Sequence, residues 1–256
     1  MPAQSTGPAV AFDGITKRYG DGTAAVDAVT LGIAAGAFVA LVGTSGSGKS
    51  TLLKTVNRLV VPSAGRVTLD GADVAEQPAH ELRRRIGYVF QNVGLFPHLS
   101  VADNIAMPLT LVGRRDPARV AAMLDLVELP AALATRMPAD LSGGQRQRVG
   151  VARALVAGPG LLLMDEPFGA LDPVTREALA QGVRRLHDDL ALTTIMVTHD
   201  MAEALLTADR VLVMERGRVV ADATPAAMLA GEGGAAADAL VAVPREQARR
   251  LAALSR

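Results

Sequence analysis

The chain has 256 residues, of which 50% are hydrophobic, and this is enough for a sizeable core in one large domain or in a domain with an inserted lobe. Its 26 basic and 26 acidic residues cancel to a net charge of zero, and its one basic cluster, Arg83–Arg85, is short, which argues against binding to nucleic-acid backbones. The absence of cysteine excludes disulfides, cysteine–zinc sites and thiol catalysis.

The N-terminal segment Met1–Pro8 has neither the basic region nor the apolar core of a signal peptide. No apolar stretch reaches the ~18 residues of a transmembrane helix. We therefore expect the chain to stay in the cytoplasm.

From Val10 to Phe38 the sequence is rich in strand patterns and leads into the first α/β element.

A phosphate-binding loop is predicted next, between an apolar strand at Ala37–Val42 and a helix at Thr51–Val56. The loop matches G-x-x-x-x-G-K-[ST] and consists of Gly43, Thr44, Ser45, Gly46, Ser47, Gly48, Lys49 and Ser50. Its backbone N–H groups and the helix N-terminus would converge on one anionic group, Lys49 would reach the β- and γ-phosphates, and the Ser50 hydroxyl would ligate Mg²⁺. A loop that served only as a turn would explain the glycines but not the adjacent Lys49 and Ser50.

The middle of the chain, from about Asn92 to Gly158, shows helical patterns broken by Pro130 and Pro138, with little strand signal. We expect an inserted helical lobe here. It contains the sequence L-S-G-G-Q at Leu141–Gln145, which we call the signature segment. Its serine and two glycines precede a helix that we expect to start near Gln145, so the segment offers backbone donors to an anion but no metal ligand.

The segment Gly160–Pro167 reads as a buried parallel strand that ends in two acids. Asp165 is suited to hold a Mg²⁺ ion, and Glu166 to orient and deprotonate the water that attacks a γ-phosphorus. A strand ending in a solvated Asp-Glu turn is the plainer alternative. Apolar strands alternate with helices from Gly160 to about Val219, which predicts a mostly parallel core sheet.

His199 directly follows the apolar strand Thr194–Val197, which places it beside the expected site. The other histidines, His80, His98 and His187, have no partners at metal-ligand spacing, and we expect them on the surface or in loops. At the C-terminal end, Gly231–Ala237 reads as a flexible linker and Arg245–Leu254 as a short amphipathic helix.

With these motifs in this order, the chain resembles the ATPase subunits of ATP-binding-cassette (ABC) transporters from about Val10 to Met228-Leu229. The resemblance implies an α/β P-loop NTPase fold with N-terminal antiparallel strands and an inserted helical subdomain at about 92–158. It makes residues 1–230 a single ATPase domain and 231–256 a linker with a short helix. The implied activity is hydrolysis of ATP with Mg²⁺ as cofactor.

The resemblance also assigns roles to individual residues. Tyr19 resembles the aromatic that stacks on adenine, Gly43 to Thr51 the phosphate loop, and Gln91 the glutamine that senses Mg²⁺ and couples to the membrane partner. Asp165 with Ser50 and Gln91 is similar to the metal site, Glu166 to the catalytic base and His199 to the switch histidine. Further nucleotide contacts are implied for Ser142, Gly143, Gly144, Gln145 and Asp172.

In that family, two copies face each other with two ATP molecules between them, and the signature segment of one completes the site of the other. The chain has one phosphate loop and one signature segment, so the resemblance implies a second copy of itself as partner. It also implies transmembrane permease subunits, an indirect link to a solute-binding protein, and a position at the cytoplasmic face of the plasma (inner) membrane. No nucleic-acid partner is expected.

The segments Glu81–Gln91 and Gly94–His98 resemble importers of osmoprotectants such as glycine betaine, choline and related quaternary amines. Importers of polyamines, sulfonates or other amino compounds share several of these pieces and remain alternatives, as does an exporter or lipoprotein-release subunit. Two alternative functions come from other classes of protein: a soluble ABC ATPase that is not coupled to transport, and a P-loop kinase or GTPase. The first would usually have two cassettes or a coiled-coil insertion, and the second would lack the signature segment.

Overall fold

The computed structural model describes residues 7–20, 22–169 and 171–254, apart from the side chains of Leu251 and Leu254. The segment 1–6, on which most of the signal-peptide argument depends, lies outside this range. Among the described helices, none combines the length and the apolar character needed to cross a membrane.

The centre of the molecule is a six-stranded sheet with the order β10-β9-β3-β8-β7-β6. Its strands β6, β7, β8, β3 and β9 are parallel neighbours, and only β10 is antiparallel to the strand beside it. The strands are β3 (Phe38–Val42), β6 (Ile86–Val89), β7 (Leu161–Asp165), β8 (Thr193–Val197), β9 (Arg210–Glu215) and β10 (Arg218–Ala223). The prediction of a mostly parallel core sheet is confirmed.

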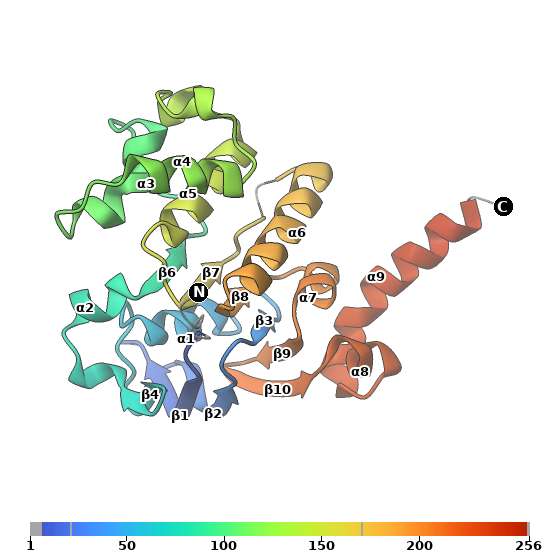
Figure 1. Ribbon diagram of the computed structural model, residues 1–256. Helices are drawn as coiled ribbons and strands as arrows, with labels where there is room; N and C mark the ends of the chain where they lie inside the picture. The colour runs from blue at the N-terminus through green and yellow to red at the C-terminus, as the bar shows by residue number, and fades with distance from the viewer. Residues whose placement is uncertain (1–6, 21, 170, 255–256) are drawn as a thin grey trace.

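A second sheet has the order β2-β1-β4-β5 and is formed by antiparallel pairs. Its strands are β1 (Val10–Arg18), β2 (Ala24–Ile33), β4 (Ala64–Leu69) and β5 (Ala72–Asp73). This sheet confirms the strand-rich prediction for the N-terminal part. In Figure 1 it lies below the helix α1 (Lys49–Val56), which follows β3.

Helices and 3₁₀ turns fill the span between β6 and β7, and no strand lies between Asn92 and Gly158, all of which the structure describes. Its α-helices are α3 (Val101–Thr110), α4 (Pro117–Leu126) and α5 (Gly143–Leu155), which form a separate group at one end of the molecule (Figure 1). The remaining helices are α2 (Ala79–Arg84), α6 (Pro173–Asp189), α7 (Met201–Thr207), α8 (Pro225–Ala230) and α9 (Gly234–Leu254).

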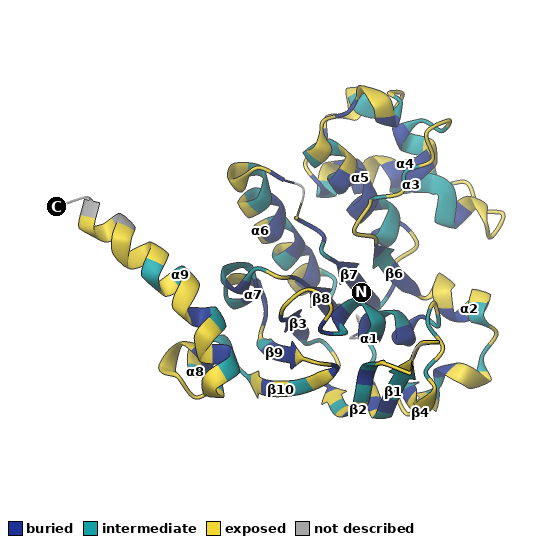
Figure 2. Ribbon diagram, turned by 180° about the vertical axis from the view of Figure 1, so that it is seen from behind, coloured by how far each residue is buried: buried dark blue, intermediate teal, exposed yellow. Residues whose placement is uncertain are grey.

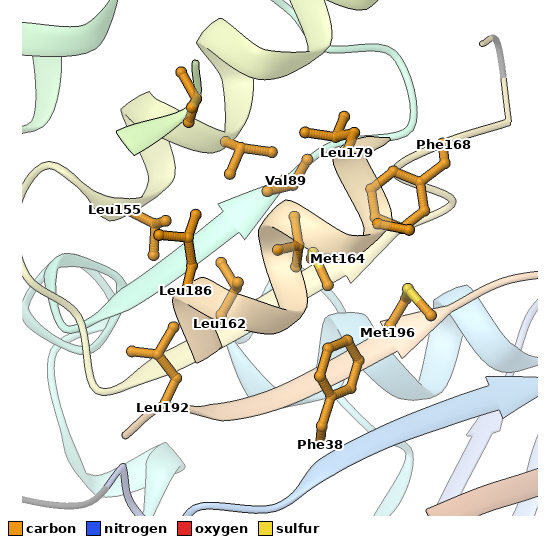
Figure 3. Close-up of a cluster of buried hydrophobic side chains, with 14 of the residues drawn as sticks. Phe38, Val89, Leu155, Leu162, Met164, Phe168, Leu179, Leu186, Leu192 and Met196 are labelled. Carbon is orange, nitrogen blue, oxygen red and sulfur yellow. The ribbon is translucent and has the colours of Figure 1, made fainter. Parts of the chain in front are cut away.

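The core consists of two clusters of buried hydrophobic side chains, and alternation along β3 divides its residues between them. Phe38, Ala40 and Val42 belong to one cluster, and Val39 and Leu41 belong to the other. The first cluster includes side chains of the helical lobe and of α6, such as those drawn in Figure 3. The second cluster joins the central sheet to the antiparallel sheet. The central sheet is therefore covered on both faces, as parallel sheets usually are.

The C-terminal prediction is wrong in one respect, because α9 starts at Gly234 and not at Arg245. The residues Ala235–Ala237 favour a helix more strongly than the preceding glycines disfavour it. Ala237 and Val241 are buried, whereas Val243 is 58% exposed. Figures 1 and 2 show that the rest of α9 extends away from the body of the molecule with a mainly exposed surface.

His187 was expected at the surface and is instead buried in α6. Its Nδ1 lies 2.9 Å from the hydroxyl of Thr194, and its ring packs 5.1 Å from that of Phe38. Burial lowers the pKa of His187 and keeps the ring neutral. His80 and His98 are exposed, as predicted.

The turn between β3 and α1 requires glycine at two positions. Gly43 has φ = 147° and Gly48 has φ = 102°, both in the region that L side chains avoid. A Cβ on Gly48 would lie 2.1 Å from the carbonyl oxygen of Ala25 in β2. The loop is therefore pressed against the antiparallel sheet, and this contact sets its path into α1.

The variants Gly48→Ala and Gly46→Ala separate that contact from simple backbone strain. Gly46 also has a positive φ of 78°, but nothing lies within 4 Å of a Cβ there. We expect Gly46→Ala to lower the free energy of unfolding by about 1 kcal/mol and Gly48→Ala by about 3 kcal/mol. Urea denaturation measures both values. Equal losses would show that the close approach to Ala25 does not constrain the loop.

Candidate functional site

Four polar groups of the predicted site lie at the same edge of the central sheet. The phosphate loop follows β3, Asp165 ends β7, His199 comes two residues after β8, and Gln91 comes two residues after β6. Because these four strands are parallel, with the order β3-β8-β7-β6, their carboxyl ends meet at this edge. Sequence-distant segments are thus brought together by strand pairing.

Lys49 is the first residue of α1, and its side chain folds back over the phosphate loop. Its Nζ donates hydrogen bonds to the carbonyl oxygens of Gly43, at 2.8 Å, and of Thr44, at 2.9 Å. The residue is only 5% exposed. Burial lowers the pKa of Lys49, while the negative charges of Glu166 and Asp165 oppose this shift. The ammonium group is therefore partly desolvated within the predicted phosphate loop.

Asp165 is 2% exposed and is surrounded by donors. Its Oδ1 accepts a hydrogen bond of 2.6 Å from the Ser50 hydroxyl. Its Oδ2 lies 2.9 Å from Nζ of Lys54 and accepts a longer bond, 3.3 Å, from the hydroxyl of Tyr88. Asp165 therefore joins the phosphate loop, α1 and β6.

The oxygen atoms of Ser50 and Asp165 are suitable ligands for Mg²⁺, which prefers carboxylate, hydroxyl and amide oxygens. Ser50 and Asp165 are in direct contact, whereas Gln91, the third predicted ligand, donates a hydrogen bond to Glu166, the residue after Asp165. No three histidine or acidic side chains of the described residues group into a protein-only metal site. A magnesium ion held here by Ser50 and Asp165 would thus take further oxygen ligands from phosphates or water, as it commonly does.

Glu166 follows the end of β7 in a strained conformation, with φ = 47°. Such a left-handed angle is uncommon for a residue with a side chain and often marks a functional position. Gln91 donates a hydrogen bond of 3.1 Å from Nε2 to Oε2 of Glu166, and Nδ1 of His199 lies 3.5 Å from the same oxygen. The predicted catalytic base, Glu166, thus contacts Gln91 and His199, to which the resemblance also assigns roles in catalysis.

The signature segment is a helix cap. Ser142 Oγ accepts a hydrogen bond from the Gln145 amide, at 3.2 Å, and Gln145 Oε1 accepts one from the Ser142 amide, at 2.9 Å. The helix α5 starts at Gly143, slightly before the predicted Gln145. No hydrogen bond or ion pair in the described part of the chain joins this segment to the phosphate loop, so one copy does not bring the two together.

Tyr19 and Asp172 are two further residues that were predicted to contact the nucleotide. Tyr19 is 50% exposed, with Nζ of Lys17 lying 5.2 Å from its ring centre. It follows Arg18, which pairs with Ala24, so it is close to the strand that contacts the phosphate loop. Asp172 caps α6 by accepting a hydrogen bond of 3.0 Å from the backbone N–H of Thr175. Hydrogen bonding from the side chain of Thr175, and then from its backbone N–H, lowers the pKa of Asp172. The neighbouring residue 170 lies outside the described range.

The sequence prediction missed two contacts of Asp165, those with Lys54 and Tyr88. The spacing of Ser50 and Lys54 was the available signal, because residues four apart share one face of a helix. No local signal points to Tyr88, since its approach depends on the pairing of β6 with β7. The prediction also missed Glu203. Burial raises the pKa of this residue to about 7.

Comparisons with known proteins agree with this geometry. Residues 26–169 match the family described as ABC transporter. A choline transport ATP-binding protein of Bacillus subtilis (strain 168) is 45% identical over 219 residues, which cover 84% of this chain and 57% of that protein. A glycine betaine uptake system ATP-binding protein of Escherichia coli (strain K12) is 48% identical over 223 residues, which cover 86% of this chain and 72% of that protein.

A third relative, a sulfate/thiosulfate import ATP-binding protein of Thermosynechococcus vestitus, is 49% identical over 222 residues, which cover 85% of this chain and 64% of that protein. The chain spans slightly more than half the length of the choline relative. Among solved structures, the dimeric ATP-binding cassette MJ0796 bound to ADP and Pi has a TM-score of 0.78 and 34% identity, covering 84% of this chain and 98% of that one. The site geometry, the fold and these similarities lead to one conclusion: the chain belongs to the ABC transporter family.

Proposed function

We propose that this chain binds ATP with Mg²⁺ and hydrolyses it to drive an ABC importer. The observation that carries the proposal is the convergence of the phosphate loop, the Ser50–Asp165 pair and Glu166 at one edge of the sheet. These are the groups that phosphoryl transfer requires: a cradle for the phosphates, a metal site and a base for the attacking water.

Each residue has a distinct task in this proposal. Lys49, which now bonds to the loop carbonyls, would turn to the β- and γ-phosphates. Ser50 and Asp165 would hold the metal ion, which when bound would offset charge on the phosphates. Gln91 and His199 both contact Oε2 of Glu166 and fix the carboxylate. We assign its Oε1 to the water: as the water oxygen bonds to the γ-phosphorus and the bond to the β–γ bridging oxygen breaks, Glu166 accepts the proton.

The second part of the proposal is a homodimer with shared sites. The signature segment is a helix N-terminus with backbone donors, but among the described residues of one copy no hydrogen bond or ion pair joins it to the phosphate loop. Facing a second copy, Ser142, Gly143 and Gly144 would reach the γ-phosphate held by the partner. The dimeric form of the MJ0796 cassette supports this arrangement.

We further propose that a permease segment docks in a groove beside Gln91. The groove has a volume of about 620 Å³ and lies between β6 and the helices α3 and α5. Its wall includes Phe90, Leu111 and Val112, which are 44%, 67% and 43% exposed, and Arg84 and Arg114 add positive charge. Since Phe90 precedes Gln91 in the chain, a segment bound here would act directly on the glutamine that contacts Glu166.

For the cargo we propose osmoprotectants such as glycine betaine, choline or related quaternary amines, delivered by a solute-binding protein. The names of the choline and glycine betaine relatives support this class. The similarity to a sulfate/thiosulfate relative shows that other solutes share this type of subunit, and polyamines and sulfonates are the next candidates. In this arrangement the chain lies at the cytoplasmic face of the inner membrane.

The variant Glu166→Gln tests the base and the dimer together. Because an amide cannot accept the proton, we expect hydrolysis to fall by at least about 100-fold while ATP still binds. ATP should then accumulate in the shared sites, and light scattering in saturating Mg-ATP should give the mass of a dimer. Glu232→Gln, at an exposed glutamate, is the matched control. A Glu166→Gln protein that stays monomeric under these conditions would refute the shared site.

The variant Ser142→Arg tests the signature segment separately from ATP binding. We expect it to remove hydrolysis by blocking the partner's γ-phosphate, whereas Lys49→Ala should weaken the binding of ATP itself. Ser100→Arg is the control, since Ser100 also caps a helix and its loss should cost a similar ~1 kcal/mol of stability. Hydrolysis that is indifferent to Ser142→Arg but sensitive to Lys49→Ala would favour a P-loop site of another class.

ATP-driven uptake by the reconstituted transporter tests the cargo. The chain would be combined with the permease and binding protein encoded beside it, and uptake of labelled glycine betaine and choline would be measured with Glu166→Gln as the inactive control. We expect Leu111→Asp to abolish uptake while the isolated subunit keeps its ATPase activity. Normal hydrolysis without uptake of either solute in the unaltered system would reject osmoprotectants and leave the ATPase assignment intact.

A further inference from the structure

Asp165 is held by contacts on both of its oxygens. Ser50 donates to Oδ1, while Lys54 and Tyr88 share Oδ2 at 2.9 and 3.3 Å. A carboxylate that is 2% exposed is costly to keep charged unless donors and an opposite charge surround it. The side chain of Lys54 is still 35% exposed, so it supplies this charge while remaining partly solvated.

The position of Lys54 follows from the geometry of α1. Ser50 and Lys54 are four residues apart and project from the same face of this helix. One face of this helix therefore contacts both oxygens of the carboxylate: the Ser50 hydroxyl bonds to Oδ1, and the Lys54 ammonium pairs with Oδ2. This arrangement fixes the rotation of the Asp165 side chain relative to the phosphate loop.

Tyr88 contacts the same oxygen, Oδ2, from a different element. It lies in β6, which pairs in parallel with β7, and its ring packs against that of Phe90 with the ring centres 4.5 Å apart. Burial and the charge of Asp165 both raise the pKa of Tyr88, so the hydroxyl keeps its proton. In this bond the Tyr88 hydroxyl is the donor and Oδ2 of Asp165 the acceptor.

We propose that Lys54 and Tyr88 are positioning residues of the metal site, which hold Oδ2 of Asp165 so that Oδ1 stays beside Ser50, the residue that would hold the ion together with it. This inference rests on the proposed function. Neither residue ligates the ion or contacts the phosphates. Partners of this kind, which orient a ligand from behind, typically change metal affinity about 10- to 100-fold when they are removed.

The variant Tyr88→Phe is the cleanest test, because it removes one hydroxyl and retains the ring. We would measure binding of Mn²⁺ to the full chain in the presence of ATP, from the electron paramagnetic resonance signal of free Mn²⁺. The dissociation constant for Mn²⁺ should rise about tenfold. Binding of a fluorescent ATP analogue in EDTA should change by less than about twofold, since it does not involve the metal. Thr110→Val, which deletes an exposed hydroxyl in α3, is the control.

The variant Lys54→Gln tests the second residue and covers the case in which Tyr88→Phe fails to fold. Loss of a nearby positive charge would by itself strengthen cation binding, whereas loss of orientation weakens it. We expect Mn²⁺ binding to weaken, with no such change in Arg66→Gln, where an exposed ion pair is lost. Stronger Mn²⁺ binding in Lys54→Gln would show that Lys54 is only a counter-charge.

The outcomes separate this inference from the proposed function. If the unaltered chain bound no nucleotide with or without metal, the proposed function would fail. If it bound Mn-ATP, and a folded Tyr88→Phe protein bound Mn²⁺ equally well, only the positioning role of Tyr88 would fail. A lower thermal stability of Tyr88→Phe with unchanged Mn²⁺ affinity would likewise assign the hydroxyl to the fold and not to the site.

Discussion

The candidate site depends on the parallel pairing of four strands. Because β3, β8, β7 and β6 run in the same direction, each delivers the residues after its carboxyl end to the same edge of the sheet. The phosphate loop, His199, Asp165 and Gln91 are separated widely in the sequence, and only this pairing places them together. Reversing any one strand would move its polar group to the opposite edge, away from the loop.

The register of these strands is in turn held by burial on both faces. All five residues of β3, of β7 and of β8 are buried, and alternate side chains of β3 belong to different core clusters. A shift of one residue would exchange the two sets of side chains between unlike clusters, which the packing opposes. The site therefore stands on a rigid base, and the strained backbone of Glu166 is tolerated directly beside it.

The charged side chains of Asp165 and Lys49 both have partners within the chain. The carboxylate of Asp165 is countered by Lys54, and the buried ammonium of Lys49 is satisfied by the carbonyl oxygens of its own loop. Binding of a polyphosphate would exchange the loop carbonyls for phosphate oxygens as acceptors for Lys49. The signature segment is not part of this network: Ser142 and Gln145 cap the start of α5, and in the described part of the chain no hydrogen bond or ion pair joins the segment to the phosphate loop. In the proposed dimer, the signature segment of one copy would instead face the phosphate loop of the other.

Local sequence was enough to predict the apolar strands, the phosphate loop with Lys49 and Ser50, and the acids Asp165 and Glu166 at and just after the end of β7. These follow from short-range periodicity, from glycine conformation and from motif spacing, all of which a single stretch of chain carries. It failed locally at α9, where the helix preference of Ala235–Ala237 outweighs the glycines before them. The tertiary structure alone decided the strand order, the burial of His187, the meeting of Gln91 and His199 on Glu166, and the contact of Tyr88 with Asp165. Those features depend on pairs of residues far apart in the chain, and the pattern of either partner does not encode which distant side chain will pack against it.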